Sequence, residues 1–191
     1  FATCPIERLV EDGQGMSLRQ LLKKPIFAAA IILMICAGAS EMSMAQWASA
    51  FAESALGLTK SVGDLAGACL FATTMGISRM LYGKFGEKID LIKFMLISGV
   101  ICVVSYLLAG LSAMPIWGLV GCVMCGFSVG IMSPGSISIT APRIPKGGTA
   151  LFALLAMAGD MGGAFGPSVV GYFSQHAGDN LQAGLLTGCI F

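Results

Sequence analysis

Charged side chains are scarce in this chain of 191 residues. Asp, Glu, Lys and Arg make up 11% of it, whereas 56% of its residues are hydrophobic. A soluble domain carries about a quarter charged residues and needs them to cover its surface. The shortage excludes an ordinary cytosolic enzyme and a disordered tail. The net charge is only +1, so there is no long-range attraction to an anionic partner, and we expect no binding of nucleic acid. What remains is a membrane protein that crosses the bilayer several times.

Catalytic and metal-binding patterns are also scarce. The chain has a single histidine and therefore no HExxH, and it has no Gly-x-Gly-Asp, so we expect no enzyme activity. Its seven cysteines are an odd number, and all but Cys4 lie in apolar runs, where a free thiol behaves as a small hydrophobic group. Cys122 and Cys125 form a CxxC without a second pair or a nearby histidine. We therefore expect neither a metal site nor a cofactor.

Apolar stretches long enough to cross a bilayer follow one another along the chain. A helix needs ~20 residues to span ~30 Å of hydrocarbon. Residues 94–142 carry no charge, which is too long a run for one crossing, and the turn is expected at residues 110–115. We predict an all-α polytopic bundle, with spans at residues 26–51, 62–81, 91–111, 116–141 and 149–173 and an incomplete sixth at 181–191.

The first 25 residues are charged and are predicted to be a cytoplasmic linker, with a short interfacial helix at residues 16–24. Pro25 is suited to the first turn of the first span. The bundle would then occupy residues 26–191. Because the stretch at 181–191 is too short to cross, we expect the chain to be a piece of a longer protein.

Orientation follows from the basic residues, which collect on cytoplasmic loops. Ten of the eleven Lys and Arg residues lie in segments 1–25, 79–93 and 142–148, and the opposite loops hold Lys60 alone. We therefore predict a multi-pass protein of the cell membrane with its amino-terminal segment in the cytoplasm.

Small residues four apart mark faces on which membrane helices approach closely. Span four has the pair Gly126–Gly130 and span five the pair Gly162–Gly166, and a proline follows each pair. Plain bundle packing explains most of these glycines. At Ser133-Pro134-Gly135 and at Gly166-Pro167 we expect broken helices beside a water-filled cavity.

Two carboxylates lie near the middle of predicted spans. Glu41 is central in span one and Asp160 is central in span five. Placing a charge at the bilayer centre costs about 2.5–3.5 kcal/mol even on the mildest insertion scale, so each is a candidate for proton transfer beside a cavity. The alternatives are that Glu41 bonds to neighbouring Ser and Gln side chains to fix packing, and that Asp160 caps a kink.

The loop between spans two and three carries the most specific pattern. Arg79, Gly83, Glu87 and Lys88 are followed by Asp90, and this segment resembles the loop motif of the major facilitator superfamily, which has glycine where Asp90 stands. Residues 126–134 and 162–171 are similar to the tenth and eleventh helices of that family. The chain thus resembles a carboxy-terminal six-helix half. The motif implies a glycine for close helix approach and an acid–base pair that holds neighbouring helices in one state. The alternative is a solvated basic loop.

Span one is similar to the seventh helix of the fucose:proton symporter-like group, through Gly38-Ala-Ser-Glu41 and an aromatic six residues later. This resemblance implies that Glu41 serves proton coupling and that Gln46 and Trp47 contact a sugar. It implies a secondary transporter that works with an amino-terminal half in the lipid bilayer, moving a small solute together with a proton. A drug or metabolite efflux antiporter is the alternative, and a non-transporting receptor or scaffold is a third.

Overall fold

The computed structural model describes residues 15–56, 59–86, 88–112 and 114–191, and over these residues the chain is helical and has no strand. Five segments are long and apolar enough to cross a membrane, and a shorter apolar helix follows them: Pro25–Ala50, Lys60–Phe85, Leu91–Leu111, Ile116–Arg143, Pro145–His176 and then Leu181–Ile190. The predicted all-α polytopic fold is confirmed.

The spans are built from the following elements. The first half of the chain contains α1 (Leu18–Leu22), α2 (Pro25–Leu56), α3 (Lys60–Gly63), the π-helical segment η1 (Asp64–Cys69), α4 (Leu70–Phe85) and α5 (Leu91–Leu111). The second half contains α6 (Pro115–Val129), α7 (Met132–Thr140), the short 3-10 turns η2 (Ala141–Arg143) and η3 (Pro145–Gly147), α8 (Gly148–His176), α9 (Leu181–Leu186) and η4 (Thr187–Ile190).

Local sequence signals set several of the helix ends. Pro25 and Pro115 open α2 and α6, where a missing N–H costs nothing. Ser17 caps α1 through a capping box with Gln20. Asp90 caps α5 by accepting from the backbone N–H of Lys93 at 3.3 Å. This hydrogen bond, together with the Lys93 side chain, lowers the pKa of the exposed Asp90 carboxyl.

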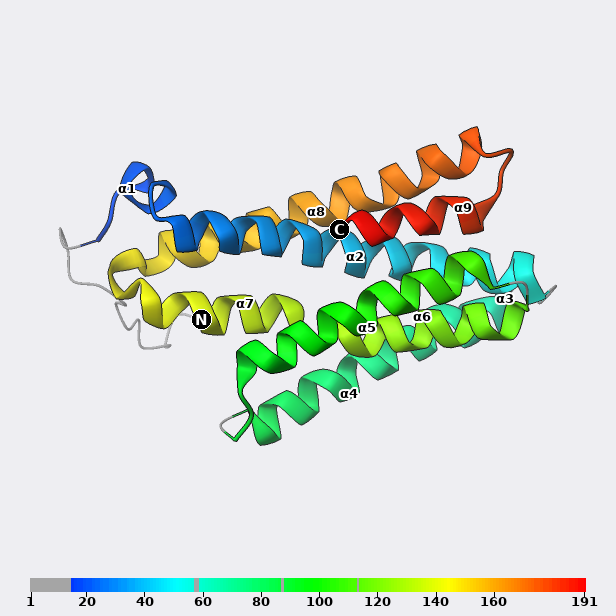
Figure 1. Ribbon diagram of the computed structural model, residues 1–191, viewed down its shortest axis with the longest axis horizontal. Coiled ribbons are helices and arrows are strands. Elements are labelled where there is room, and N and C mark those ends of the chain that lie inside the picture. The colour runs from blue at the N-terminus through cyan, green and yellow to red at the C-terminus, as the bar shows by residue number, and fades with distance from the viewer. Residues whose placement is uncertain (1–14, 57–58, 87, 113) are drawn as a thin grey trace, which may run out of the picture.

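The helix α2 lies alongside α8 over much of its length (Figure 1). The contact depends on glycine, because a Cβ added to Gly162 would overlap the backbone carbonyl of Ile35, and one added to Gly38 would overlap the carbonyl of Gly159. The face predicted from Gly162–Gly166 is therefore a true contact face. The helices α4, α5 and α6 group on the other side of α2 (Figure 1), and there Gly126 packs against the backbone of Phe71.

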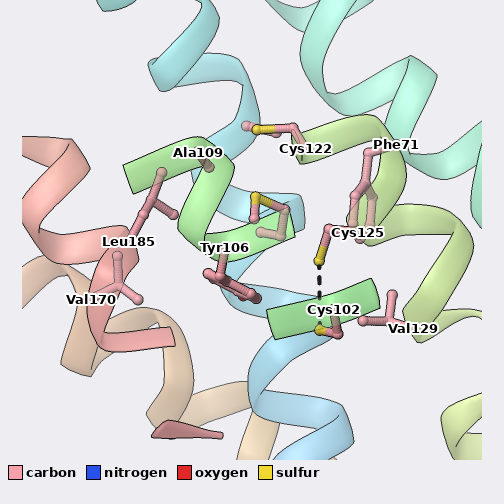
Figure 2. Close-up of a cluster of buried hydrophobic side chains, with 11 residues drawn as sticks. Phe71, Cys102, Tyr106, Ala109, Cys122, Cys125, Val129, Val170 and Leu185 are labelled. Atoms are coloured by element: carbon pink, nitrogen blue, oxygen red, sulfur yellow. Dashed lines mark hydrogen bonds between the residues drawn. The ribbon is translucent and has the colours of Figure 1, made fainter. Parts of the chain in front are cut away.

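One buried cluster is built from side chains of α2, α4, α5, α6, α8 and α9 (Figure 2). Tyr106 of α5 is fully buried, and its hydroxyl donates to the carbonyl of Ser40 in α2 at 2.7 Å. Around it pack the thiols of Cys102 and Cys125, whose sulfurs are 4.0 Å apart. Many apolar side chains elsewhere, such as Leu96, are exposed. Exposed apolar side chains are what lipid-facing positions require.

The predicted linker forms α1 where a short helix was expected. Its Leu21 is fully buried with Phe27, Ile144 and Leu151, and the N–H of Met16 donates to the carbonyl of Lys146 at 2.9 Å. This part of the linker therefore packs against the loop between spans four and five. Residues 1–14 lie outside the described part of the chain.

The predicted helix breaks need correction. Span four is interrupted at residues 130 and 131, one turn before the expected Ser133-Pro134-Gly135, which lies within α7. Span five continues through Pro167 without interruption. A proline removes the hydrogen bond to the carbonyl four residues earlier and crowds that carbonyl. Close packing nevertheless holds α8 on α2, through Gly162 and Gly166 before Pro167 and through Gly171 against Trp47 after it.

Candidate functional site

An ion pair joins two spans inside the bundle. Glu41 of α2 accepts from Nη2 of Arg79 in α4 at 3.2 Å, and the two side chains are 19% and 45% exposed. The sequence placed Arg79 at the start of the basic segment 79–93, as part of the loop motif after span two. The helix instead continues to Phe85, so Arg79 lies about 9 Å inside its end and reaches across to α2.

The same guanidinium also contacts the interruption in span four. Nε of Arg79 donates to the carbonyl of Gly130 at 3.2 Å. In a regular helix that carbonyl would accept from the N–H of residue 134, but Pro134 has none. Arg79 therefore supplies the donor that Pro134 lacks. Gly130 itself packs tightly on α4, since an added Cβ would lie 2.8 Å from the carbonyl of Met75.

A second feature is a pocket of about 480 Å³ between α2 and α8. Its polar side chains are Gln46, Ser168, Tyr172 and Gln175, and none is charged. It lies toward the end of the bundle that holds α3 and the connection between α8 and α9 (Figure 1). Another pocket, of about 640 Å³ beside α5, is lined almost wholly by apolar side chains and offers a polar solute little to bind.

Trp47 forms one wall of the polar pocket in a fixed orientation. Its indole N–H donates to the carbonyl of Pro167 at 3.3 Å, so its one hydrogen-bond donor is used. Pro167 in turn has no N–H to offer the carbonyl of Gly163, which also lines the pocket. Trp47 thus gives the pocket an aromatic wall, and Gly163, another lining residue, has a carbonyl without its usual helical donor.

The predicted site residues do not all line the same pocket. Gln46 and Trp47 line the pocket, whereas Glu41 does not. Glu41 and Gln46 are five residues apart in α2, which corresponds to a rotation of roughly 140° about the helix axis. Glu41 is therefore directed toward α4 and Gln46 toward α8. Asp160 is exposed on α8, and in the described part of the chain it makes no ion pair or hydrogen bond with Glu41.

The loop motif is only partly described. Glu87 lies outside the described residues. An added Cβ on Gly83 would meet nothing within 4 Å, so the expected close helix approach is not made there by any described residue. Lys88 is exposed, and Asp90 pairs with Lys93 at 3.3 Å rather than with the rest of the motif.

One pattern in span four has the spacing of a hydrolase nucleophile motif, Gly126-Phe-Ser128-Val-Gly130. Such a serine is exposed on a sharp turn between a strand and a helix. Ser128 is instead fully buried within α6, and its hydroxyl donates to the carbonyl of Cys125 at 2.8 Å. It has no exposed position from which to attack a substrate.

Sequence reasoning missed the pairing of Glu41 with Arg79. A signal was present, because Glu41 lacks a basic residue on its own span, and Arg79 is the only basic residue of the 62–81 stretch. A carboxylate within the bilayer needs a partner, and Arg79 was the available one.

Comparison with known proteins agrees with this architecture. A family model described as Major Facilitator Superfamily matches residues 6–187. No curated protein and no solved structure resembles the chain closely enough to match it. The family match takes in the five spans that the structure describes, and the family consists of transporters rather than enzymes. This multi-pass membrane protein belongs to the Major Facilitator Superfamily and is a transporter of a small molecule.

Proposed function

We propose that the protein is a proton-coupled symporter of a neutral, hydroxyl-rich solute, with sugars as the preferred class. The observation that carries this proposal is the pocket between α2 and α8, whose polar lining has no charge. Its volume of about 480 Å³ falls in the range of small-molecule sites. In this proposal the chain acts as the carboxy-terminal half and works with an amino-terminal six-helix half that supplies the opposite wall.

The chemistry of the lining supports a solute with many hydroxyls. The amides of Gln46 and Gln175 each offer donors and an acceptor, and the hydroxyls of Ser168 and Tyr172 can do either. Because the indole N–H of Trp47 is bonded to Pro167, its ring presents an apolar face. A sugar has both hydroxyls and an apolar ring face to match this wall. An anionic or cationic drug would find no counter-charge in the lining.

Glu41 is the residue to which we assign proton coupling. It is partly buried and pairs with a single arginine, so protonation of its carboxylate leaves a positive charge without a partner inside the bundle. Such a change in local charge is large enough to favour another helix arrangement. Asp160, exposed on the pocket-bearing helix α8, is the second carboxylate that we assign to the coupling pathway.

The remaining assignments complete the proposal. We place the protein in the cell membrane with the α1 end in the cytoplasm, so that the pocket opens toward the outer half of the bilayer. Arg79, Gly83, Glu87 and Lys88 would serve the change between inward-facing and outward-facing states at the cytoplasmic ends of the helices. Within this family the subgroup similar to fucose:proton symporters fits these assignments best.

The test is uptake and counterflow of a panel of sugars by the intact protein in proteoliposomes, with and without an inward proton gradient. We expect saturable sugar counterflow, and uptake that the gradient accelerates. Glu41→Gln should retain counterflow and lose the acceleration. The matched control is Glu53→Gln, a carboxylate on the same helix near its outer end, which should behave as the wild type.

Two pocket variants test the binding site separately. Gln46→Ala should raise the KM for sugar, as should Trp47→Leu, because the first removes hydrogen bonds and the second removes the aromatic face. Gln20→Ala, outside the pocket, is the control for a lost amide. Counterflow of no sugar, or solute export driven by the proton gradient, would refute sugar symport, and the second result would favour an efflux antiporter.

A further inference from the structure

We propose that Arg79 couples the protonation of Glu41 to the interruption of span four, as a positioning residue between the two. The inference rests on the proposed role of Glu41 and adds the element that its charge controls. Nη2 of Arg79 bonds to Glu41 and Nε bonds to the carbonyl of Gly130, each at 3.2 Å. One guanidinium thus holds α2, α4 and the junction of α6 with α7.

The Gly130 carbonyl depends on this contact because of Pro134. Without an N–H at position 134, the helix cannot supply its own donor, and the helical hydrogen bonding is interrupted at residues 130 and 131, whose backbone angles remain right-handed helical. A carbonyl left without a partner inside a bundle is costly. The geometry of the junction therefore depends on where the side chain of Arg79 lies.

Arg79 in turn depends on Glu41. Its side chain is 45% exposed, so water competes for the guanidinium, and the carboxylate is the partner that holds it over Gly130. When Glu41 takes up a proton, a charge-assisted hydrogen bond becomes a weaker neutral one. Arg79 then moves toward water, and the Gly130 carbonyl loses its donor.

A replacement donor lies at the same place. The hydroxyl of Ser78 is buried and has no hydrogen-bond partner among the described residues. It packs against Gly130, at 3.2 Å from the position that a Cβ would occupy there. Ser78 is therefore an unused donor beside the junction, and among the described residues it makes no bond to the Gly130 carbonyl.

No other charged side chain takes the place of Arg79. On the elements that pack against α2, Asp160 is on the exposed side of α8, and Asp64 of η1 bonds to Ser49 instead. Lys60 begins α3, toward the outer end of the bundle, Arg19 lies in α1 before α2 begins, and α6 and α7 carry no charged residue. Arg79 is the charged group that faces Glu41 in the described part of the chain.

The experiment is hydrogen–deuterium exchange of the peptide covering residues 126–140 in the intact protein, in lipid nanodiscs at pH 7.5. Loss of a hydrogen bond to a charged group raises local opening by about tenfold or more. We expect Glu41→Gln to exchange about tenfold faster than the wild type in this peptide, and Glu53→Gln to match the wild type. A pH series, corrected for intrinsic exchange rates, should move the wild type toward Glu41→Gln as the pH falls.

Pro134→Ala provides the decisive comparison, because alanine restores the N–H that Gly130 lacks. In that background Glu41→Gln should no longer accelerate exchange. Arg79→Lys, which keeps the charge but lacks the planar fork that contacts both partners, should exchange fast while Glu41 is charged. This variant keeps the test decisive should Pro134→Ala fold poorly.

Two results would overturn the inference: no acceleration by Glu41→Gln, or an equal acceleration with and without Pro134. Proton-driven uptake, measured on the same proteins, separates this inference from the proposed function. If Glu41→Gln accelerates exchange but leaves coupled uptake unchanged, the proposed function fails and the linkage stands. If coupling is lost while exchange is unchanged, the linkage alone fails.

Discussion

Replacing Gly162 by alanine should separate α2 from α8. A glycine-to-alanine change within a helix normally gains up to ~1 kcal/mol, because alanine has the higher helix propensity. At Gly162 the new methyl would overlap the backbone carbonyl of Ile35, which cannot rotate away as a side chain would. Overpacking of this kind costs ~1–3 kcal/mol. Since the obstacle is backbone, we expect the upper end of that range and a net loss of ~2 kcal/mol.

The assay is thermal unfolding of the intact protein in detergent, followed by size-exclusion chromatography of heated samples. A loss of ~2 kcal/mol corresponds to a fall in Tm on the order of 5 °C. The control is Gly76→Ala in α4, where an added Cβ meets nothing within 4 Å and where stability should hold or rise. The pocket lies between α2 and α8, so the KM for solute should also rise in Gly162→Ala alone. Equal Tm values for the two variants would refute the close-packing argument.

Three further predictions follow from single contacts. Tyr106→Phe removes a buried hydrogen bond to α2 and should lower the free energy of unfolding by about 1 kcal/mol; an unchanged Tm would contradict this. The backbone N–H and side chain of Lys93 lower the pKa of Asp90. The negative charge of Asp90 therefore stabilises the fold above roughly pH 4, and this stabilisation is lost as the pH falls through the lowered pKa of Asp90. Asp90→Asn, which keeps the cap, should therefore lower Tm at pH 7 but not in strong acid. Pro167→Ala gives the carbonyl of Gly163 a helical donor and should therefore raise the KM for solute. A KM equal to that of the wild type would show that this carbonyl does not contribute to binding.

The sequence predicts the spans well because hydrophobic length and charge are local properties. The turn between spans three and four and the start of α2 at Pro25 follow directly from residue type. Glycine pairs such as Gly162–Gly166 also identified a real contact face. These features need no knowledge of how one helix is rotated against another.

The pairing of Glu41 with Arg79 could not be predicted in the same way. The two residues are 38 positions apart, and their contact depends on the rotation of α4 about its own axis. The position of the break in span four was wrong by one turn for a related reason, because proline acts on the carbonyl four residues earlier rather than on its own position. Gln46 and Trp47 do line one pocket, but only the packing of α2 on α8 shows which wall they form.

The wide turn η1, Asp64–Cys69, accommodates one extra residue with almost no change in that rotation. A π-helical turn holds one more residue than the α-helical turn it replaces, and each residue of an α-helix corresponds to about 100° of rotation. Deleting a single residue within η1 would let the segment wind as ordinary helix through nearly the same total angle, so Arg79 would still face α2. Deleting a residue between Leu70 and Arg79, where the chain is already α-helical, would instead rotate Arg79 by about 100° and turn it away from α2.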